Sequence, residues 1–435
     1  MKERNSKVGL IAVAWRNLSR YKVKTALTLV AVIFGVTMFI FIDGLMMGLN
    51  VDSERNIINY ETGALKIYSK AFFEKRDEIP MYETFTGYEA LQEKLEGLGF
   101  DSAARVKFGG SLISREQEVP FMFAGVDIAR ENTVLHYDEF IEDGAFPRSG
   151  QFEVLLGARG AKNLSVAVGD HVRLSTVIDK KDSNGKIRHI NQVIDLKVAG
   201  IMNTPNPLLN GMFAVLPMDI LQDELGLLLE GDVTEIVIRG KGENLAMVPD
   251  AYAQKEQIVS MFAGTLPDNL IVTTWEEDAI DFLTITRSKS SATGLIVFFI
   301  FILAGMGISN TMMMAVMERT KELGMMRSMG MTDAQVVRAF MYEGGLIGFT
   351  GSIIGVVLGV LINLYMVNIG IDFTKMLESF EGEYGYRVVG VFKSTWVYST
   401  IVFSGVIATV ISAVAAYFPA RRGVKMAITD ALRFE

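Results

Sequence analysis

Four long apolar stretches separate the charged parts of the chain. They cover residues 25–49, 292–317, 344–367 and 396–418. Each offers roughly 20 or more residues with few charges, about what a helix rising 1.5 Å per residue needs to cross a hydrocarbon core about 30 Å thick. The pattern predicts a membrane protein with four transmembrane α-helices.

A polar region, residues 50–291, lies between the first and second apolar stretches and shows the alternation of a folded domain. Strands are expected at residues 64–68, 103–108, 119–126, 233–238 and 270–274, and amphipathic helices at 88–98 and 248–262. Strand, helix and strand recur on both sides of a central interruption. This order predicts a large α+β domain whose α+β lobe is split by an insertion.

The insertion, about residues 131–231, is predicted to be a mainly β lobe. Its expected elements are strands at 154–157, 172–177 and 194–201, a polar hairpin tip at 182–185 and a helix at 216–229. The flanks of the whole region, residues 52–60 and 276–290, are polar but keep apolar residues at helical spacing. We expect these flanks to extend the neighbouring spans as a helical stalk.

The positions of lysine and arginine predict the orientation. Residues 1–24 hold seven of them, and the tail after the fourth span holds Arg421, Arg422, Lys425 and Arg433. The positive-inside rule therefore places both termini and the loop after the second span in the cytoplasm. Residues 51–286 hold 22 Lys and Arg against 38 Asp and Glu, and this acidic region is expected outside.

The expected order of parts follows from these patterns. Ile11, Trp15 and Leu18 form one apolar stripe near the N-terminus, which is typical of a helix lying along the membrane surface. The predicted parts are an interfacial helix at 1–24, spans at 25–49, 292–317, 344–367 and 396–418, an extracytoplasmic domain at 50–291, a cytoplasmic coupling helix at 318–343, an external loop at 368–395 and a cytoplasmic tail at 419–435.

Composition excludes several classes of site. Half of the 435 residues are hydrophobic and 21% are charged, which fits a membrane protein with one large soluble domain. The sequence has no Cys, and His136, His171 and His189 are not paired at ligand spacing, so no zinc or thiol chemistry is predicted. It also lacks a phosphate-binding Gly-x4-Gly-Lys-Ser/Thr loop and a credible catalytic triad. No bound cofactor or enzymatic activity is expected.

The charged run between the second and third spans carries the most specific motif. It reads Glu-Arg-Thr-Lys-Glu-Leu-Gly from residue 318, and on charge alone a solvated turn is an equal alternative. The motif resembles the coupling segment of the FtsX-like permease superfamily of ABC transporters. The resemblance implies that this coupling segment, residues 318–331, contacts a separate or fused ATPase that binds ATP and Mg. The implied contact residues are Glu318, Arg319, Thr320, Lys321, Glu322, Gly324, Arg327 and Gly330.

Other motifs extend the resemblance over nearly the whole chain. Residues 15–20 and the C-terminal runs 419–422 and 431–435 resemble terminal signatures of the superfamily, although Ala427-Ile428 replaces its usual Asp-Pro. Leu-Leu-Gly, Val-Gly-Asp and Val-Ala-Gly-Ile elements in the polar region resemble the external domain of lipoprotein-releasing permeases of the LolC and LolE type. Residues 204–211 depart from the glycine-rich turn that is usual there.

Small and charged residues inside the spans suggest packing sites. A ladder of glycines at steps of three or four in the third span predicts close helix packing within the subunit, with a dimer contact as the alternative. The ladder consists of Gly344, Gly348, Gly351, Gly355 and Gly359. Asp43 in the first span is expected to reach lipid headgroups at the outer interface, with a substrate-gating role as the alternative.

The resemblance implies a permease subunit in the bacterial inner membrane that works by mechanotransmission, moving its external domain when an ATPase closes. Release of lipoproteins from the outer leaflet for delivery to the outer membrane is the favoured function. Efflux of a peptide or antibiotic is one alternative, and regulation of an external cell-wall hydrolase is another. The expected partners are a cytoplasmic ABC ATPase, a second permease subunit, membrane lipids, a lipoprotein and a periplasmic carrier, with no nucleic acid.

Overall fold

A computed structural model describes residues 22–115, 117–181, 187–224, 231–262, 266–374, 376, 387, 388 and 390–425. The chain divides into two compact units, each with its own hydrophobic core. The first, called the helix bundle, comprises Met1–Leu49, Thr286–Asp372 and Val391–Glu435. The second, called the sheet domain, comprises Asn50–Ile285 and Phe373–Gly390.

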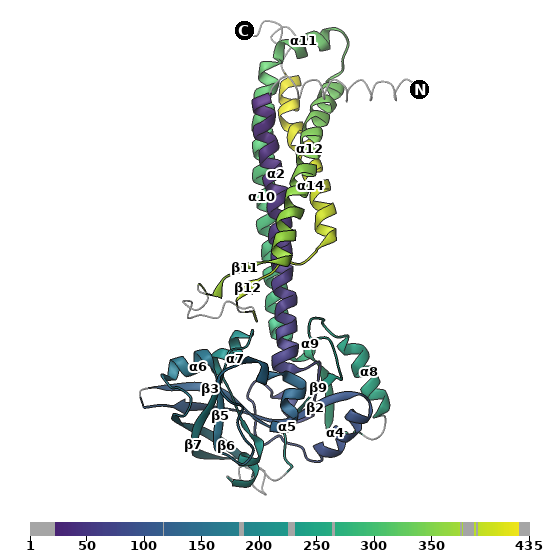
Figure 1. The fold of residues 1–435 in the computed structure, drawn as a ribbon. Coiled ribbons are helices and arrows are strands. Elements are labelled where there is room, and N and C mark those ends of the chain that lie inside the picture. The colour runs from purple at the N-terminus through teal and green to yellow at the C-terminus, as the bar shows by residue number, and fades with distance from the viewer. Residues whose placement is uncertain are drawn as a thin grey trace. The chain divides into compact units, whose positions relative to one another are not determined.

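Among the described residues, four helices are long and apolar enough to cross a membrane. They are α2 (Lys22–Ile57), α10 (Ile280–Glu318), α12 (Asp333–Asn368) and α14 (Tyr398–Val424), as Figure 1 shows. The first three predicted spans lie within these helices, and α14 begins two residues later than the fourth prediction. α2 begins in the helix bundle and ends in the sheet domain, while α10 begins in the sheet domain and ends in the bundle.

The bundle helices are apolar on more than one face. Val36, Ile308, Ile347 and Ala416 are buried among the helices, whereas residues such as Phe403 expose large apolar side chains. A helix that is apolar all round requires an apolar surrounding, which a membrane provides. The other elements among the described residues of this unit are the short helix α11 (Thr320–Ser328) and a two-stranded sheet of β11 (Ile371–Asp372) and β12 (Val391–Phe392).

The sheet domain contains one ten-stranded sheet in the order β10-β1-β9-β2-β3-β8-β5-β7-β4, with β6 pairing both β2 and β7. Its strands are β1 (Leu65–Ser69), β2 (Phe100–Ile113), β3 (Glu118–Val126), β4 (Ile141–Gly144), β5 (Glu153–Gly157), β6 (His171–Lys181), β7 (Ile187–Met202), β8 (Phe213–Pro217), β9 (Glu235–Gly240) and β10 (Leu270–Thr274).

Short helices and helical turns connect these strands. They are η1 (Ile58–Thr62), α3 (Lys70–Glu74), α4 (Tyr88–Gly97), α5 (Ile128–Leu135), η2 (Tyr137–Phe140), α6 (Ala158–Leu164), α7 (Pro207–Met212), η3 (Ile220–Glu224), α8 (Ala251–Met261) and α9 (Trp275–Asp278). The two helices expected outside the insertion match α4 and α8 closely in position.

The inserted strands are hydrogen-bonded to the flanking ones and continue the same sheet. β8 pairs in parallel with β3, so that Met122 lies opposite Phe213. The helix expected at 216–229 is wrong at its start, because residues 216 and 217 complete β8 and a π-helical turn, η3, follows. The hairpin tip at 182–185, the interfacial helix up to residue 21 and the tail from residue 426 lie outside the described residues.

Helices cover both faces of the central strands. On β9, Ile236 and Ile238 join the core that contains α4 and α8, whereas Val237 joins a second core with α5. Because side chains alternate along a strand, a strand covered on both faces is buried throughout. Charged residues on such strands must therefore be buried too, and β9 begins with one of them, Glu235.

Candidate functional site

The coupling segment forms a separate helix between two long ones. α10 ends at Glu318, Arg319 occupies the N-cap of α11, and Ser328 is the last residue of that helix. Gly330 then has a φ of 98°, in the left-handed region that favours glycine. Thr332 starts α12 with a capping box. The chain thus bends at both ends of α11.

A buried ion pair fixes the beginning of α11 against α12. Nη1 of Arg319 lies 3.0 Å from Oε2 of Glu343, and the two residues are only 4% and 6% exposed. Thr320 is also buried and donates a hydrogen bond to the carbonyl oxygen of Met317 at 2.7 Å. Breaking a buried pair on one side leaves the other charge without compensation, at a cost of about 3 to 5 kcal/mol. Arg319 and Glu343 therefore hold α11 in place.

The predicted contact residues divide into an inward and an outward set. Arg319, Thr320 and Gly324 are buried, so in this conformation they position α11 and do not present a surface to a partner. The outward set consists of the exposed Glu318, Lys321 and Gly330 and the half-buried Glu322 and Arg327. The sequence motif had grouped both sets as contacts.

Methionines line a hollow beneath this helix. A pocket of about 450 Å³ lies between α11 and α12 and is lined by Met325, Met326, Met329 and Met331, with Phe340. Met329 is 79% exposed. Because the methionine side chain is unbranched and adaptable, this surface can change shape against a partner. The α11 surface thus combines exposed charges with a hollow lined largely by methionines.

The glycine ladder of α12 faces two neighbouring helices of the same subunit. A methyl group added at Gly344 would lie 2.7 Å from Cβ of Ala416, and one at Gly348 would lie 2.6 Å from Cβ of Ser412, both on α14. The other three glycines of the ladder approach α2 instead. Their nearest side chains are Val32 for Gly351, Val36 for Gly355 and Ile40 for Gly359. Side chains are absent where the helices approach most closely.

Asp43 lies beside α14 and accepts a hydrogen bond from the hydroxyl group of Thr400. The sequence placed this carboxylate among lipid headgroups or in a gating role. In the structure it has a partner within the bundle.

A buried charge cluster occupies one face of the sheet domain and was not foreseen from the sequence. Glu235 on β9 stands opposite Tyr68 on β1 and opposite Arg105 on β2. Oε2 of Glu235 lies 3.3 Å from Nζ of Lys66, and Oε1 lies 3.6 Å from Nη1 of Arg105 and 3.7 Å from Nζ of Lys107. Three cations thus surround one carboxylate.

Two more carboxylates complete this charge cluster, which consists of Lys66, Arg105, Lys107, Glu131, Glu235 and Asp278. Glu131 on α5 forms an ion pair with Arg105. Asp278 on α9 lies 3.5 Å from Nζ of Lys66 and accepts a hydrogen bond from Tyr68. Three positive and three negative groups share this space, so each charge has partners. Five of the side chains are almost fully buried, and that of Lys107 is 16% exposed.

The charge cluster also fixes the segments that adjoin the long helices within the sheet domain. The hydroxyl group of Tyr137 receives a hydrogen bond from Arg105 and donates one to the carbonyl oxygen of Tyr60 at 2.8 Å. Tyr60 belongs to η1, which directly follows α2. Asp278 belongs to α9, which directly precedes α10. The cluster therefore connects both segments to the central strands.

Burial and neighbouring charges shift the pKa values inside the cluster. Burial alone would raise the pKa of Glu235, but the positive charges of Lys107, Lys66 and Arg105 lower it to about 2. Burial lowers the pKa of Lys107 to about 8. The pKa of Tyr137 is raised, chiefly by burial. The carboxylate of Glu235 is therefore ionised at any physiological pH.

One feature of the sequence could have drawn attention to these residues. The signal is a charged residue within or at the start of a short run of strand-forming apolar residues, as at Lys66, Arg105 and Glu235. A charge at such a position is buried only if it has a partner. Lys66 and Glu235 lie 169 residues apart, however, and only the strand register brings them together. The described residues include no group of three or more His, Asp and Glu side chains arranged to hold a metal ion.

Comparison with known proteins identifies the family of this chain. Residues 25–255 match the family model of the MacB-like periplasmic core domain, more than half of the chain, and residues 294–428 match that of the FtsX-like permease C-terminal domain. The chain belongs to the FtsX-like permeases of the MacB type. The FtsX-like match includes the coupling segment and the glycine ladder, as the motif predicted.

Two relatives of this FtsX-like permease agree with the family at modest identity, and one solved structure is similar to part of the chain. An uncharacterized ABC transporter permease from Methanocaldococcus jannaschii is 23% identical over 98% of both chains. The lipoprotein-releasing system transmembrane protein LolC of Neisseria meningitidis is 24% identical over 72% of both chains. The crystal structure of the periplasmic region of MacB from Actinobacillus actinomycetemcomitans covers 53% of this chain and 95% of its own, with a TM-score of 0.33 and 11% identity.

Proposed function

We propose that this FtsX-like permease is the membrane subunit of an ABC transporter and that it works by mechanotransmission. A cytoplasmic ABC ATPase docks on the coupling segment, and that ATPase binds ATP and Mg²⁺. One observation carries the proposal: α11 is fixed to α12 by the buried pair of Arg319 and Glu343 while Glu318 and Lys321 are exposed beside it. A helix that is fixed on one side and accessible on the other can receive force from a partner.

The connections of α11 define two routes for that force. α10 leads directly into α11 through Arg319, and α12 follows after four residues. Displacing α11 therefore acts on both long helices, through the chain itself and through the buried ion pair. In the sheet domain, the charge cluster fixes the segments that adjoin α2 and α10, so movement of these helices acts on the central strands.

The substrate that we propose is a lipoprotein, released from the outer leaflet of the bacterial inner membrane and passed to a periplasmic carrier. Relatives named LolC support this choice. In this arrangement both termini are cytoplasmic, the sheet domain is extracytoplasmic, and a second permease subunit completes the complex. Expulsion of a peptide or antibiotic is the second candidate, favoured by a macrolide export ATP-binding/permease protein MacB from Rhodopirellula baltica that is 30% identical over 33% of this chain.

The docking proposal is tested by changing the outward residues of α11. In the double variant Glu318→Ala with Lys321→Ala, we expect folding to be retained and co-purification with the cognate ABC ATPase to fall about tenfold, since loss of polar contacts at an interface costs about 1 to 3 kcal/mol. Lys241→Ala with Glu256→Ala removes the same charges from an exposed surface of the sheet domain and serves as the control. Equal co-purification of both variants would contradict docking on this surface.

The substrate is tested separately with the purified permease and its ATPase in proteoliposomes. Lipoprotein release predicts ATP-dependent transfer of a triacylated lipoprotein to a soluble carrier. ATP-dependent movement of a macrolide or peptide without lipoprotein transfer would support the second candidate instead. ATP-dependent activation of a cell-wall hydrolase, with neither transfer, would assign the chain to the regulators.

A further inference from the structure

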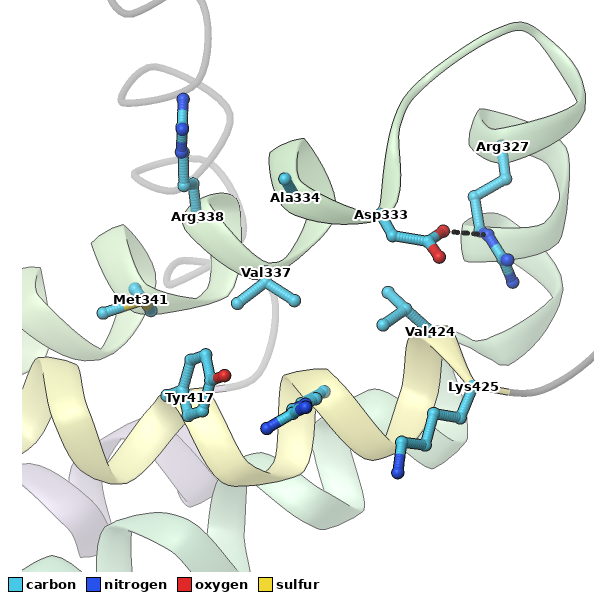
Figure 2. Close-up of a pocket in the computed structure, with 10 residues that line it drawn as sticks. Arg327, Asp333, Ala334, Val337, Arg338, Met341, Tyr417, Val424 and Lys425 are labelled. Atoms are coloured by element: carbon cyan, nitrogen blue, oxygen red, sulfur yellow. Dashed lines mark ion pairs between the residues drawn. The ribbon is translucent and has the colours of Figure 1, made fainter.

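A second pocket of the helix bundle lies between the start of α12 and the end of α14. Its volume is about 760 Å³, and it is separate from the methionine-lined hollow under α11. Four cations line it: Arg327, Arg338, Arg421 and Lys425. The only carboxylate among its lining residues is that of Asp333, and Figure 2 shows this group directed at Arg327, with which it forms an ion pair of 2.9 Å.

The other three lining cations, Arg338, Arg421 and Lys425, add positive charge to the pocket. In the part of the chain that the structure describes, no carboxylate lies within 4.0 Å of the nitrogen atoms of Arg338, Arg421 or Lys425. Arg421 lies over the ring of Tyr417, with 5.9 Å between its guanidinium carbon and the ring centroid. This contact orients the side chain without neutralising it. The pocket therefore favours an anion.

The rest of the lining is apolar. Val337 and Met341 on α12 and Tyr417 and Val424 on α14 line the same pocket, and Figure 2 shows Val337 between the two helices. One face of α14 continues this apolar surface along the helix. Val410, Val414 and Phe418, at steps of four residues, are 55%, 49% and 63% exposed. A cationic pocket thus adjoins an exposed apolar strip on a membrane-spanning helix.

This combination of chemistries matches an anionic phospholipid. Guanidinium and ammonium groups bind phosphate through charge-assisted hydrogen bonds, and an apolar helix face accommodates acyl chains. Basic pockets between membrane helices near the cytoplasmic surface are suited to anionic headgroups. A soluble anion would contact the cations alone, whereas a phospholipid can contact the cations and the adjoining strip on α14 together.

We propose that this pocket binds the headgroup of an anionic phospholipid of the phosphatidylglycerol or cardiolipin class. Arg421 holds its phosphate, Arg338 and Lys425 add positive charge at the edges of the pocket, and an acyl chain lies along Val410, Val414 and Phe418. Because the pocket is lined by α12, α14 and the last turn of α11, a bound lipid ties these three helices together.

The chain offers a matched pair of variants for testing this site. Arg421 lines the pocket, whereas its neighbour Arg422 is exposed on the same turn of α14 and is not part of the lining. Arg421→Gln and Arg422→Gln each remove one positive charge, from adjacent positions of the helix. Arg421→Lys keeps the charge and serves as a test for rescue.

The measurement uses the purified full-length permease in a neutral detergent, without any ATPase. Thermal unfolding is followed while dioleoyl phosphatidylglycerol, dioleoyl phosphatidylcholine or inorganic phosphate is added. We expect stabilisation by phosphatidylglycerol only. Arg421→Gln should weaken its apparent affinity roughly tenfold, as expected for the loss of one charge-assisted hydrogen bond to an anion, whereas Arg422→Gln should match the wild type and Arg421→Lys should recover most of the affinity.

Three outcomes would overturn the proposal. Equal weakening by Arg421→Gln and Arg422→Gln would indicate attraction to the general surface charge. Stabilisation by inorganic phosphate at the same concentration would identify a soluble anion as the ligand. Equal stabilisation by phosphatidylcholine would show that lipid binding does not use the cations.

Discussion

The coupling segment and the charge cluster use buried ion pairs to fix helical segments, but with different redundancy. In the helix bundle, one buried pair, Arg319 with Glu343, holds the start of α11 against α12, and a more exposed pair, Arg327 with Asp333, joins its last turn to the first residue of α12. In the sheet domain, three cations surround Glu235 and two further carboxylates complete the set. Losing Arg319 or Glu343 should release the start of α11, whereas losing Glu235 should disturb the sheet domain as a whole. If the proposed mechanism holds, we expect the attachment of α11 to be easier to displace than the attachment in the sheet domain.

The largest expected effect comes from neutralising the centre of the charge cluster. Glu235→Gln keeps the shape of the side chain but leaves Lys66, Arg105 and Lys107 in excess of their remaining partners. Breaking a buried pair costs about 3 to 5 kcal/mol, and at about 2 to 4 °C per kcal/mol for a domain of this size the unfolding midpoint should fall by roughly 10 °C. The midpoint is measured by thermal unfolding of the detergent-solubilised protein, and Glu256→Gln, at an exposed residue, is the control. A midpoint equal to that of the control would remove the distinction between the two attachments.

A smaller effect is expected where the bundle packs without charges. At Gly355 an added Cβ would lie 2.9 Å from Cβ of Val36, so Gly355→Leu should push α12 away from α2. Overpacking of this kind costs about 1 to 3 kcal/mol. The matched control is Gly307→Leu on α10, where no described atom lies within 4 Å of the added Cβ. If Gly355→Leu unfolded at the same midpoint as the wild type, close packing of α12 against α2 at this glycine would not contribute to stability.

The smallest expected effect is a pH dependence of the charge cluster. The pKa of Lys107 is about 8 in the folded protein and ordinarily 10.5, so between these values the unfolded chain binds more protons and stability rises with pH. Below about pH 8 both states carry the proton, and this contribution is constant. The unfolding midpoint should therefore rise more from pH 7 to pH 9.5 in the wild type than in Lys107→Met. An identical increase in the two proteins would mean that Lys107 is not desolvated.

The sequence predicted the elements better than their partners. Four apolar runs of membrane length and the strands β1, β3, β9 and β10 could be read from local pattern, because helical and strand periodicities are properties of neighbouring residues. The charge cluster could not, since Lys66 and Glu235 meet only through the register of β1 against β9. Short helices such as α6 have too few residues to show a period.

The coupling segment shows the same limit at the level of single residues. The coupling helix was expected at residues 318–343, whereas α11 covers only Thr320–Ser328 and α12 begins at Asp333. Charge alone also did not distinguish Arg319, which is buried, from Lys321, which is exposed. The distinction depends on Glu343, which lies 24 residues further on in α12. The partners of the glycine ladder on α2 and α14 were likewise a matter of tertiary packing.

The central claim is that α11 transmits force because Arg319 and Glu343 hold it against α12. The most direct measurement is substrate-coupled ATP hydrolysis by the reconstituted complex carrying Arg319→Ala, Glu343→Ala or the exchange of Arg319→Glu with Glu343→Arg. We expect each single variant to keep the unfolding midpoint of the sheet domain and to lose at least tenfold in coupled hydrolysis, and the exchange to restore a large part of it. Unchanged coupling in both single variants would contradict the account.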